Sequence, residues 1–239
     1  MSDQYPDISI KAMEWRRGQH GDSVRLNVVR GDNHVHRNGK AFLADKKNKT
    51  QLLSLLLQLW QDPGDAQALK DKSFYVACKS FRLSSDDGVS VTCQCVEDLF
   101  CTDEEADTRL LQQSQHAADS GAPSGVIRSP DTHVAVLCCH VQNHLQIPIY
   151  FRTGTQTRTR YVDISGVCKS LPDSMCDILP AVHALTGCDA TSASIGKGKS
   201  AGYQFALSIP ALREDLRHLG VSFEVSEELQ RICETFVCS

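Results

Sequence analysis

Strand-like and helix-like segments alternate along the middle of this 239-residue chain, and their order limits the possible folds more than any other feature. Alternating or short buried apolar runs predict strands at 73–84, 89–96, 126–128, 147–152 and 159–164. Apolar residues at helical spacing predict helices at 48–60, 102–118, 174–186, 200–207, 210–218 and 225–237. This order predicts an α/β domain with a mostly parallel sheet flanked by helices, followed by a C-terminal helical element. Functional groups are then expected at the carboxyl ends of the strands.

Both ends of this pattern are expected to be truncated. No predicted strand precedes Asp3, although an α/β domain is expected to begin with one. At the other end, Cys238 and Ser239 fall inside an amphipathic helical segment. We therefore expect the chain to be a fragment or an incomplete gene product.

Composition narrows the class and the location of the protein. A net charge of −4 argues against a uniformly basic nucleic-acid binder but is compatible with local basic patches. The first residues contain no apolar signal segment, and the longest apolar stretch, Leu52 to Trp60, is too short to span a bilayer. Eleven cysteines without a Cys-x-x-Cys pair indicate reduced thiols that act as small core hydrophobes. We expect a nuclear or cytoplasmic protein that is not secreted and has no membrane partner.

Acidic residues lie at the edges of three separate predicted elements. Glu105 and Asp107 open a predicted helix, and Asp131 directly follows a predicted strand, where it also begins the next helix. Asp189 follows the end of another predicted helix. Carboxylates that converge from separate elements bind Mg²⁺ or Mn²⁺, and paired ions of this kind cut phosphodiesters. Taken singly, each acidic residue is explained as well or better as a helix cap or as a favourable charge at a helix N-terminus.

A Gly-Lys-Gly-Lys loop follows the last of these carboxylates. Its final residues resemble the end of a Walker A loop, but that motif requires a glycine where Ala193 stands. One alternative is a turn whose N–H groups and lysines hold a nucleic-acid phosphate, and the other is a flexible surface loop. The candidate nucleic-acid contacts are Gly196, Lys197, Gly198 and Lys199. Histidines such as His183 have no metal-ligand spacing, so we expect them to be satisfied or exposed.

At these residues the chain resembles the PIN-like nucleases of the flap endonuclease/XPG type. Its blocks EEADTRLL, SPDTHV and LPAVHALTGCDATS are closest to those of uncharacterised members of that superfamily that occur in many copies in animal genomes. The resemblance covers most of the chain. It implies a PIN/flap-endonuclease-like core over residues 1–190, with a variable basic and helical insertion at 10–72. It also implies a helical nucleic-acid-binding element at 191–239 and an ancestral Mg²⁺- or Mn²⁺-dependent structure-specific nuclease whose partner is DNA rather than RNA.

The resemblance also assigns metal ligands. Glu105 and Asp107 match the E-x-E/D pair of the family, and Asp131 matches the first acid of its D-x-D motif. Asp189 matches the aspartate of a Gly-x-Asp motif, and Asp3 matches the aspartate of a Phe-Asp motif that ends an early strand.

Two departures from the family pattern bear on activity. His133 stands where the family has the second Asp of D-x-D, and neutral imidazole is a poor ligand for Mg²⁺ although it suits Mn²⁺ or zinc. The family's first metal-binding Asp, on the opening strand, has no counterpart. Three interpretations stay open: a Mg²⁺- or Mn²⁺-dependent phosphodiesterase, a catalytically inactive module that binds nucleic acid or protein, and an α/β structural domain without a ligand.

Overall fold

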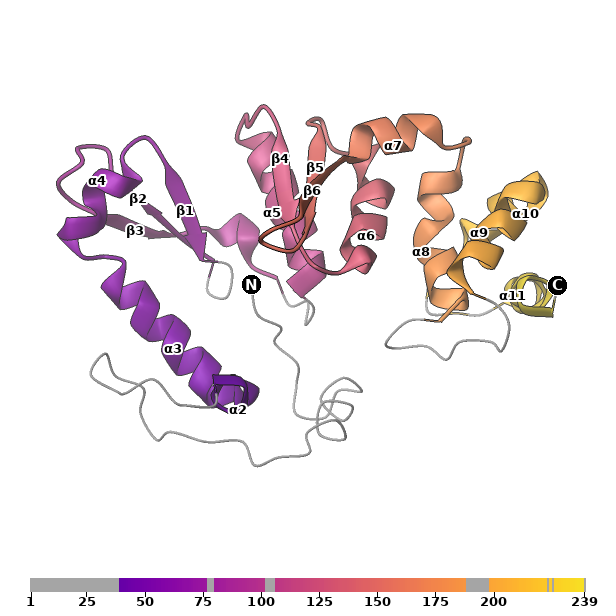
Figure 1. Ribbon diagram of the computed structural model, residues 1–239, viewed down its shortest axis with the longest axis horizontal. Helices are drawn as coiled ribbons and strands as arrows, with labels where there is room; N and C mark the ends of the chain where they lie inside the picture. Colours follow the sequence, from indigo (N-terminus) through magenta and orange to yellow (C-terminus); the bar gives the residue numbers. More distant parts are fainter. Residues whose placement is uncertain are drawn as a thin grey trace. The chain divides into compact units, whose positions relative to one another are not determined.

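The computed structural model describes residues 39–76, 80–101, 106–187, 198–222, 224 and 226–238. Strands and helices alternate along the described chain and a run of helices ends it, so the predicted α/β class is confirmed (Figure 1). The chain divides into two compact units, residues 1–109 and 110–239. No described helix combines the length and the apolar character that crossing a bilayer requires.

The helical part of the first unit comprises α2 (Gly39–Ala44), α3 (Lys46–Leu59), the 3-10 turn η1 (Pro63–Asp65) and α4 (Ala66–Leu69). Helix α3 begins earlier than predicted because Asp45 is its N-cap and accepts the Asn48 N–H at 3.0 Å. Asn48, where the predicted helix begins, is fully buried instead, and its side-chain amide donates to the Phe42 carbonyl at 3.0 Å.

An antiparallel sheet completes the first unit, with strand order β1-β2-β3. Its strands are β1 (Ser73–Val76), β2 (Phe81–Ser84) and β3 (Thr92–Cys95), and η2 (Glu97–Leu99) follows. The single strand predicted over 73–84 is wrong, because β1 and β2 are separate paired strands; β2 in turn pairs with β3. Leu57, Val76 and Leu83 form the core of this unit, and the Trp60 ring lies edge-on to Phe74 at 5.0 Å between centroids.

A mixed sheet with order β4-β5-β6 organises the second unit. Its elements are α5 (Ala106–Asp119), which begins just before the unit boundary, β4 (Gly125–Arg128), α6 (Thr132–Gln142), β5 (Ile149–Gly154), β6 (Thr159–Asp163) and α7 (Ile164–Ser170). Strands β4 and β5 are parallel across α6, whereas β5 and β6 form an antiparallel hairpin. Among the described strands this is the one parallel pairing, so the expected mostly parallel sheet is wrong. The short link from β5 to β6 leaves no room for the crossover that parallel strands need.

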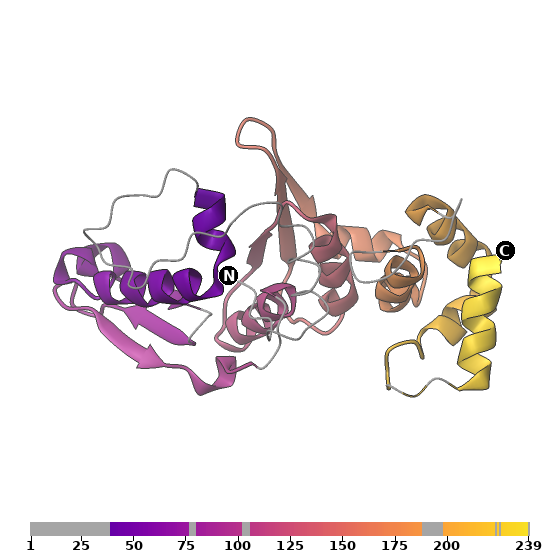
Figure 2. The ribbon, with the colours of Figure 1, turned by 90° about the horizontal axis from the view of Figure 1, so that it is seen from below.

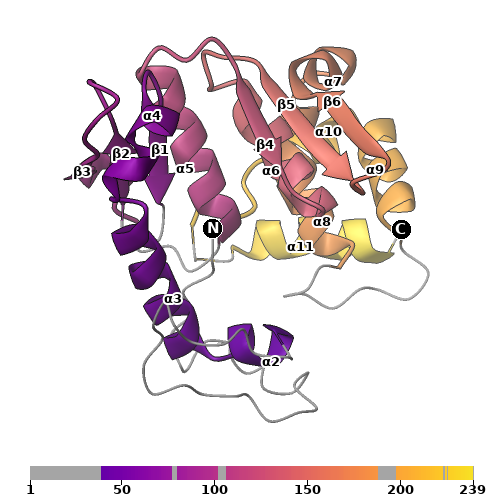
Figure 3. The ribbon, with the colours of Figure 1, turned by 60° about the vertical axis from the view of Figure 1, so that its left-hand side comes forward.

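Helices α6 and α7 cover one face of this sheet. Ile127, Ile149 and Phe151 are buried on that face against Val134 of α6 and Ile164 of α7. Figure 3 shows the three strands side by side, with α6 packed on them. The neighbouring positions of each strand point to the opposite face, since successive side chains of a strand alternate.

The C-terminal helices pack together in a second core of the same unit. They are α8 (Met175–Leu185), α9 (Lys199–Ser208), α10 (Pro210–Leu216) and α11 (Glu227–Cys238), which confirms the four helices predicted there. Gly202 of α9 allows the closest approach, because a Cβ at this position would lie 2.4 Å from the Thr186 methyl group. The predicted boundary at 190/191 lies outside the described residues, and helices on both sides of it share this core.

Candidate functional site at the ends of α6, α8 and α9

Asp131 is the residue that leads from β4 into α6. Its backbone N–H donates to Ser129 Oγ at 3.1 Å, and its Oδ1 accepts the His133 N–H at 2.9 Å. These bonds make Asp131 the N-cap of α6, so the prediction that it begins this helix is confirmed. The side chain is exposed at the carboxyl end of β4, the edge at which functional groups were expected.

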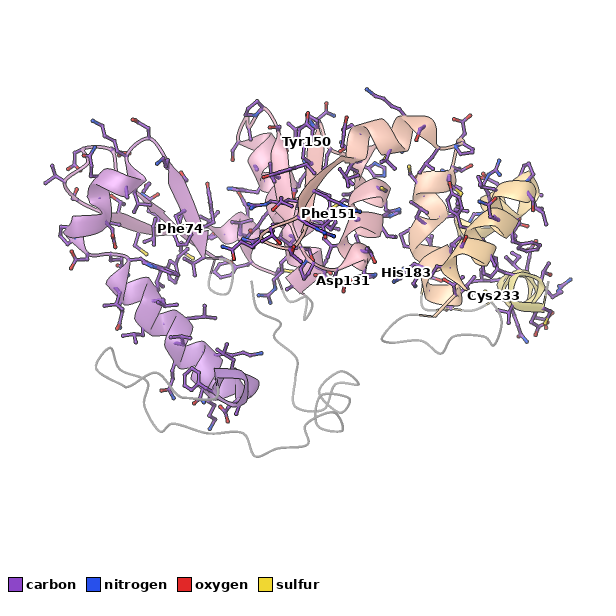
Figure 4. The ribbon with its side chains drawn as sticks, in the orientation of Figure 1. Phe74, Asp131, Tyr150, Phe151, His183 and Cys233 are labelled. Carbon is purple, nitrogen blue, oxygen red and sulfur yellow. The ribbon has the colours of Figure 1, made fainter. Side chains whose placement is uncertain are left out.

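Histidines from two helices meet next to this cap. The rings of His133, in the first turn of α6, and His183, in the last turn of α8, lie 4.7 Å apart between centroids and are tilted by 43°. Helices α6 and α8 pack side by side, and the start of α6 lies against the end of α8, so the two helices run antiparallel. Figure 4 labels Asp131 and His183 at this shared end.

Lys199, the first residue of α9, extends the cluster. Its Nζ donates to the Gly187 carbonyl at 2.8 Å and lies 3.1 Å from His183 Nδ1. Because an ammonium group has only protons to give, Nδ1 is the acceptor and the ring proton of neutral His183 resides on Nε2. A lysine is unfavourable at the N-terminus of its own helix but favourable at the carboxyl end of α8, where carbonyl groups point outward.

The close packing of α9 on α8 fixes this lysine. Thr186 donates through Oγ1 to the Val182 carbonyl at 2.7 Å, which orients its methyl group. That methyl group occupies the space above Gly202, one turn after Lys199. Gly187 adopts φ of +91°, a conformation that glycine tolerates, and ends α8 there. This part of the site is therefore built where the end of α8 and the start of α9 are held close together.

The described donors at this site do not fit Mg²⁺. They comprise the single carboxylate of Asp131 and two imidazoles, one of which already accepts a hydrogen bond from Lys199. Nδ1 of His133 is buried without a hydrogen-bond partner among the described residues. No group of three His, Cys, Asp or Glu side chains within the described ranges could hold a metal ion. Magnesium needs several oxygen ligands in octahedral geometry, which one carboxylate does not provide.

The structure brings together only part of the predicted set. Asp131, His133 and Lys199 belong to the cluster just described, and Gly198 is the exposed N-cap residue of α9. Asp107 is half-buried in the first turn of α5, within residues 1–109. The other predicted residues lie outside the described part of the chain: Asp3, Glu105, Asp189, Gly196 and Lys197.

His183 was missed as a site residue because its sequence neighbourhood has no ligand spacing. Its partners come from positions 133 and 199, so only the packing of three helices brings them together. One signal was available in the sequence. A lysine at the first position of a helix, where an acidic residue is favoured, indicates an interaction beyond that helix.

Comparison of the chain with family models, with curated proteins and with solved structures finds no match in any of the three.

Proposed function

We propose that this chain is a PIN/flap-endonuclease-like domain that binds the phosphate backbone of DNA and has lost metal-dependent cleavage. One observation carries the proposal. The ammonium group of Lys199 and the rings of His133 and His183 gather beside Asp131, where the resemblance expects several carboxylates. The ammonium group of Lys199 is a positively charged hydrogen-bond donor, which suits a phosphate and repels a divalent cation.

The position of the lysine adds support. Lys199 is exposed although its Nζ contacts the end of α8. An ammonium group has three donors, and two of them are used in these contacts. The third donor suits a phosphate oxygen of a bound strand. Exposed N–H groups at the start of α9 add the positive end of a helix dipole to the same region.

A metal-dependent phosphodiesterase is the second candidate, and Asp131 favours it. This carboxylate is exposed directly after a strand of the sheet, as a metal ligand of the resembled family would be. In such an enzyme Mg²⁺ or Mn²⁺ would activate water and stabilise the charge of the phosphate in the transition state.

Binding and cleavage of flapped DNA separate the two candidates. We expect the wild-type chain to bind a labelled flapped duplex without cutting it in Mg²⁺ or Mn²⁺. Lys199→Gln should weaken binding several-fold and should lower the salt dependence of binding by the amount expected for about one phosphate contact. Arg231→Gln is the matched control, because it removes a charge from exposed Arg231 on α11 and should have no such effect.

Cleavage by the wild type that Asp131→Asn abolishes would overturn the loss of catalysis. Asparagine keeps the capping oxygen of Asp131 but removes the negative charge that a metal ion needs. His133→Asp is the complementary change. If it produces Mg²⁺-dependent cleavage in a chain that otherwise only binds, the ancestral site differs from an active one by that ligand alone.

A further inference from the structure

Side chains on one face of the β4–β5–β6 sheet are buried under α6 and α7, whereas large side chains on the opposite face, called the open face below, are exposed in the described part of the chain. On the open face Val126 is 59% exposed and Tyr161 is 61% exposed, and Tyr150 is exposed between them. These fractions are high for large side chains in the body of a sheet, where packing normally buries them. Figure 4 labels Tyr150 and Phe151, consecutive residues of β5 that are exposed and buried respectively.

One row across this open face combines two cations and an aromatic ring. The strand register places Arg128 of β4 opposite Arg152 of β5, and Arg152 opposite Tyr161 of β6. The Arg152 guanidinium carbon lies 5.8 Å from the Tyr161 ring centroid. Within the described residues neither arginine forms an ion pair. Both guanidinium groups therefore keep their donors for a ligand, and the ring holds one of them in place.

A pocket lies beside this row, at the carboxyl ends of β4 and β5. It has a volume of about 190 Å³ and is lined by Arg128, Arg152, the Ser129–Pro130 segment and the residues that follow β5. The Ser129 N–H donates to the Arg152 carbonyl at 3.2 Å, which ties the two strand ends together. A planar guanidinium group binds two phosphate oxygens at once, and here two such groups face one pocket.

The β5–β6 hairpin, which carries Arg152 and Tyr161 of the row, is basic. Gly154 has φ of +93°, and a Cβ there would lie 2.2 Å from the Arg158 carbonyl oxygen, so the turn requires glycine. The hairpin tip projects from the rest of the second unit (Figure 2). Residues 125–163 contain four arginines against two aspartates, whereas the whole chain carries a net charge of −4. Asp131 and Asp163, the two aspartates, both cap helices through their carboxylates.

We infer that this open face binds single-stranded nucleic acid, with phosphates at Arg128 and Arg152 and an unpaired base stacked on Tyr161. The ligand class rests on the proposed function, but the residues are different from those at the ends of α6, α8 and α9. An exposed ring offers its face to any unpaired base, whereas the bases of a duplex are already stacked on one another. An acidic peptide would pair with the arginines but would gain little from the ring.

Fluorescence anisotropy with a labelled oligothymidylate tests the inference. Tyr161→Leu should weaken binding about ten-fold, since it removes one stacked base, while Tyr161→Phe should bind like the wild type. Arg152→Gln should weaken binding and reduce the slope of log affinity against log salt by about 0.7. Arg231→Gln is again the charge-matched control, and thermal melting checks that each variant is folded.

The outcomes separate this inference from the proposed function. Weaker binding in Lys199→Gln, with no change in Tyr161→Leu and Arg152→Gln, would overturn the open-face site and leave the proposed function standing. The reverse pattern would support the open face and remove the site at Lys199. Equal affinity for a duplex of the same length, or displacement of the oligonucleotide by polyglutamate at equal charge, would overturn the assignment to a single strand.

Discussion

The two ends of the antiparallel pair α6–α8 have opposite chemistry. At one end the exposed carboxylate of Asp131 lies beside the half-buried imidazoles of His133 and His183. At the other end Cys139 of α6 and Cys176 of α8 are buried, and Cys168 Sγ donates to the Cys139 carbonyl at 3.5 Å. Burial raises the pKa of the Cys139 thiol to about 11 and that of Cys176 to about 12.

The two clusters differ in whether their side chains are available for chemistry. Thiols with raised pKa values stay protonated at neutral pH and are poor nucleophiles and poor metal ligands. The buried cysteines therefore act as small apolar residues, as the sequence predicts. Ligand chemistry on this helix pair is confined to the end that carries Asp131.

The largest effect is expected from Gly202, whose small size lets α9 approach the polar end of α8. Gly202→Ala places a methyl group into Thr186 and should lower the free energy of unfolding by about 2 kcal/mol. Gly198→Ala is the matched control, because no atom of the described residues lies within 4 Å of its added Cβ and its φ is negative. Urea unfolding measures both variants. Equal stability of the two would mean that close packing does not hold α9 on α8.

An effect of intermediate size on stability is expected at Asp131, where two substitutions separate its role as a helix cap from its charge. Asp131→Ala should cost about 1 kcal/mol, because it leaves N–H groups at the start of α6 without their acceptor. Asp131→Asn should stay within about 0.5 kcal/mol of the wild type, since the amide oxygen still caps. An asparagine variant clearly more stable than the wild type would indicate repulsion from other carboxylates, and would revive the metal-site interpretation.

The free energy of unfolding measured as a function of pH tests the buried thiols of Cys139 and Cys176. Unfolded thiols lose their proton near pH 9.0, whereas folded Cys139 and Cys176 keep theirs to about 11 and 12. Between these values the folded state binds more protons, so the free energy of unfolding must fall as pH rises. Cys176→Ala should reduce that slope by about one proton. Cys238→Ala, at an exposed cysteine, is the control that should leave the contribution of the buried thiols intact.

The smallest effect on stability is expected at Lys199. Its contacts with His183 and Gly187 are exposed, so Lys199→Gln should change the free energy of unfolding by less than about 0.5 kcal/mol. Thermal unfolding of the two proteins side by side measures the difference. A loss of 2 kcal/mol or more would make this lysine a structural cap of α8 and weaken the argument for phosphate binding.

Local patterns predicted most elements, and tertiary contacts explain the failures. Helix α8 and the β5–β6 hairpin follow from apolar periodicity and turn residues, which are properties of neighbouring positions. The break between β1 and β2 does not, because Ser80 takes a φ of +52° that its Oγ bond to the distant Leu99 carbonyl supports. The candidate site could likewise be predicted only in part, because some of its contacts depend on tertiary packing. Asp131 is recognisable as a cap from its neighbours, whereas the contact of Lys199 with His183 depends on how α9 packs.

Trp60, whose ring contacts Phe74 in the first unit, determines what fluorescence can report about this protein. The two tryptophans of the chain, Trp15 and Trp60, both precede Arg109, so residues 110–239 contain none. Indole emission therefore reports on the first unit alone, and tyrosine absorbance or circular dichroism must follow the second. Denaturation curves from the two probes coincide only if both units unfold in one transition, so a single protein sample reveals whether the two units are energetically coupled.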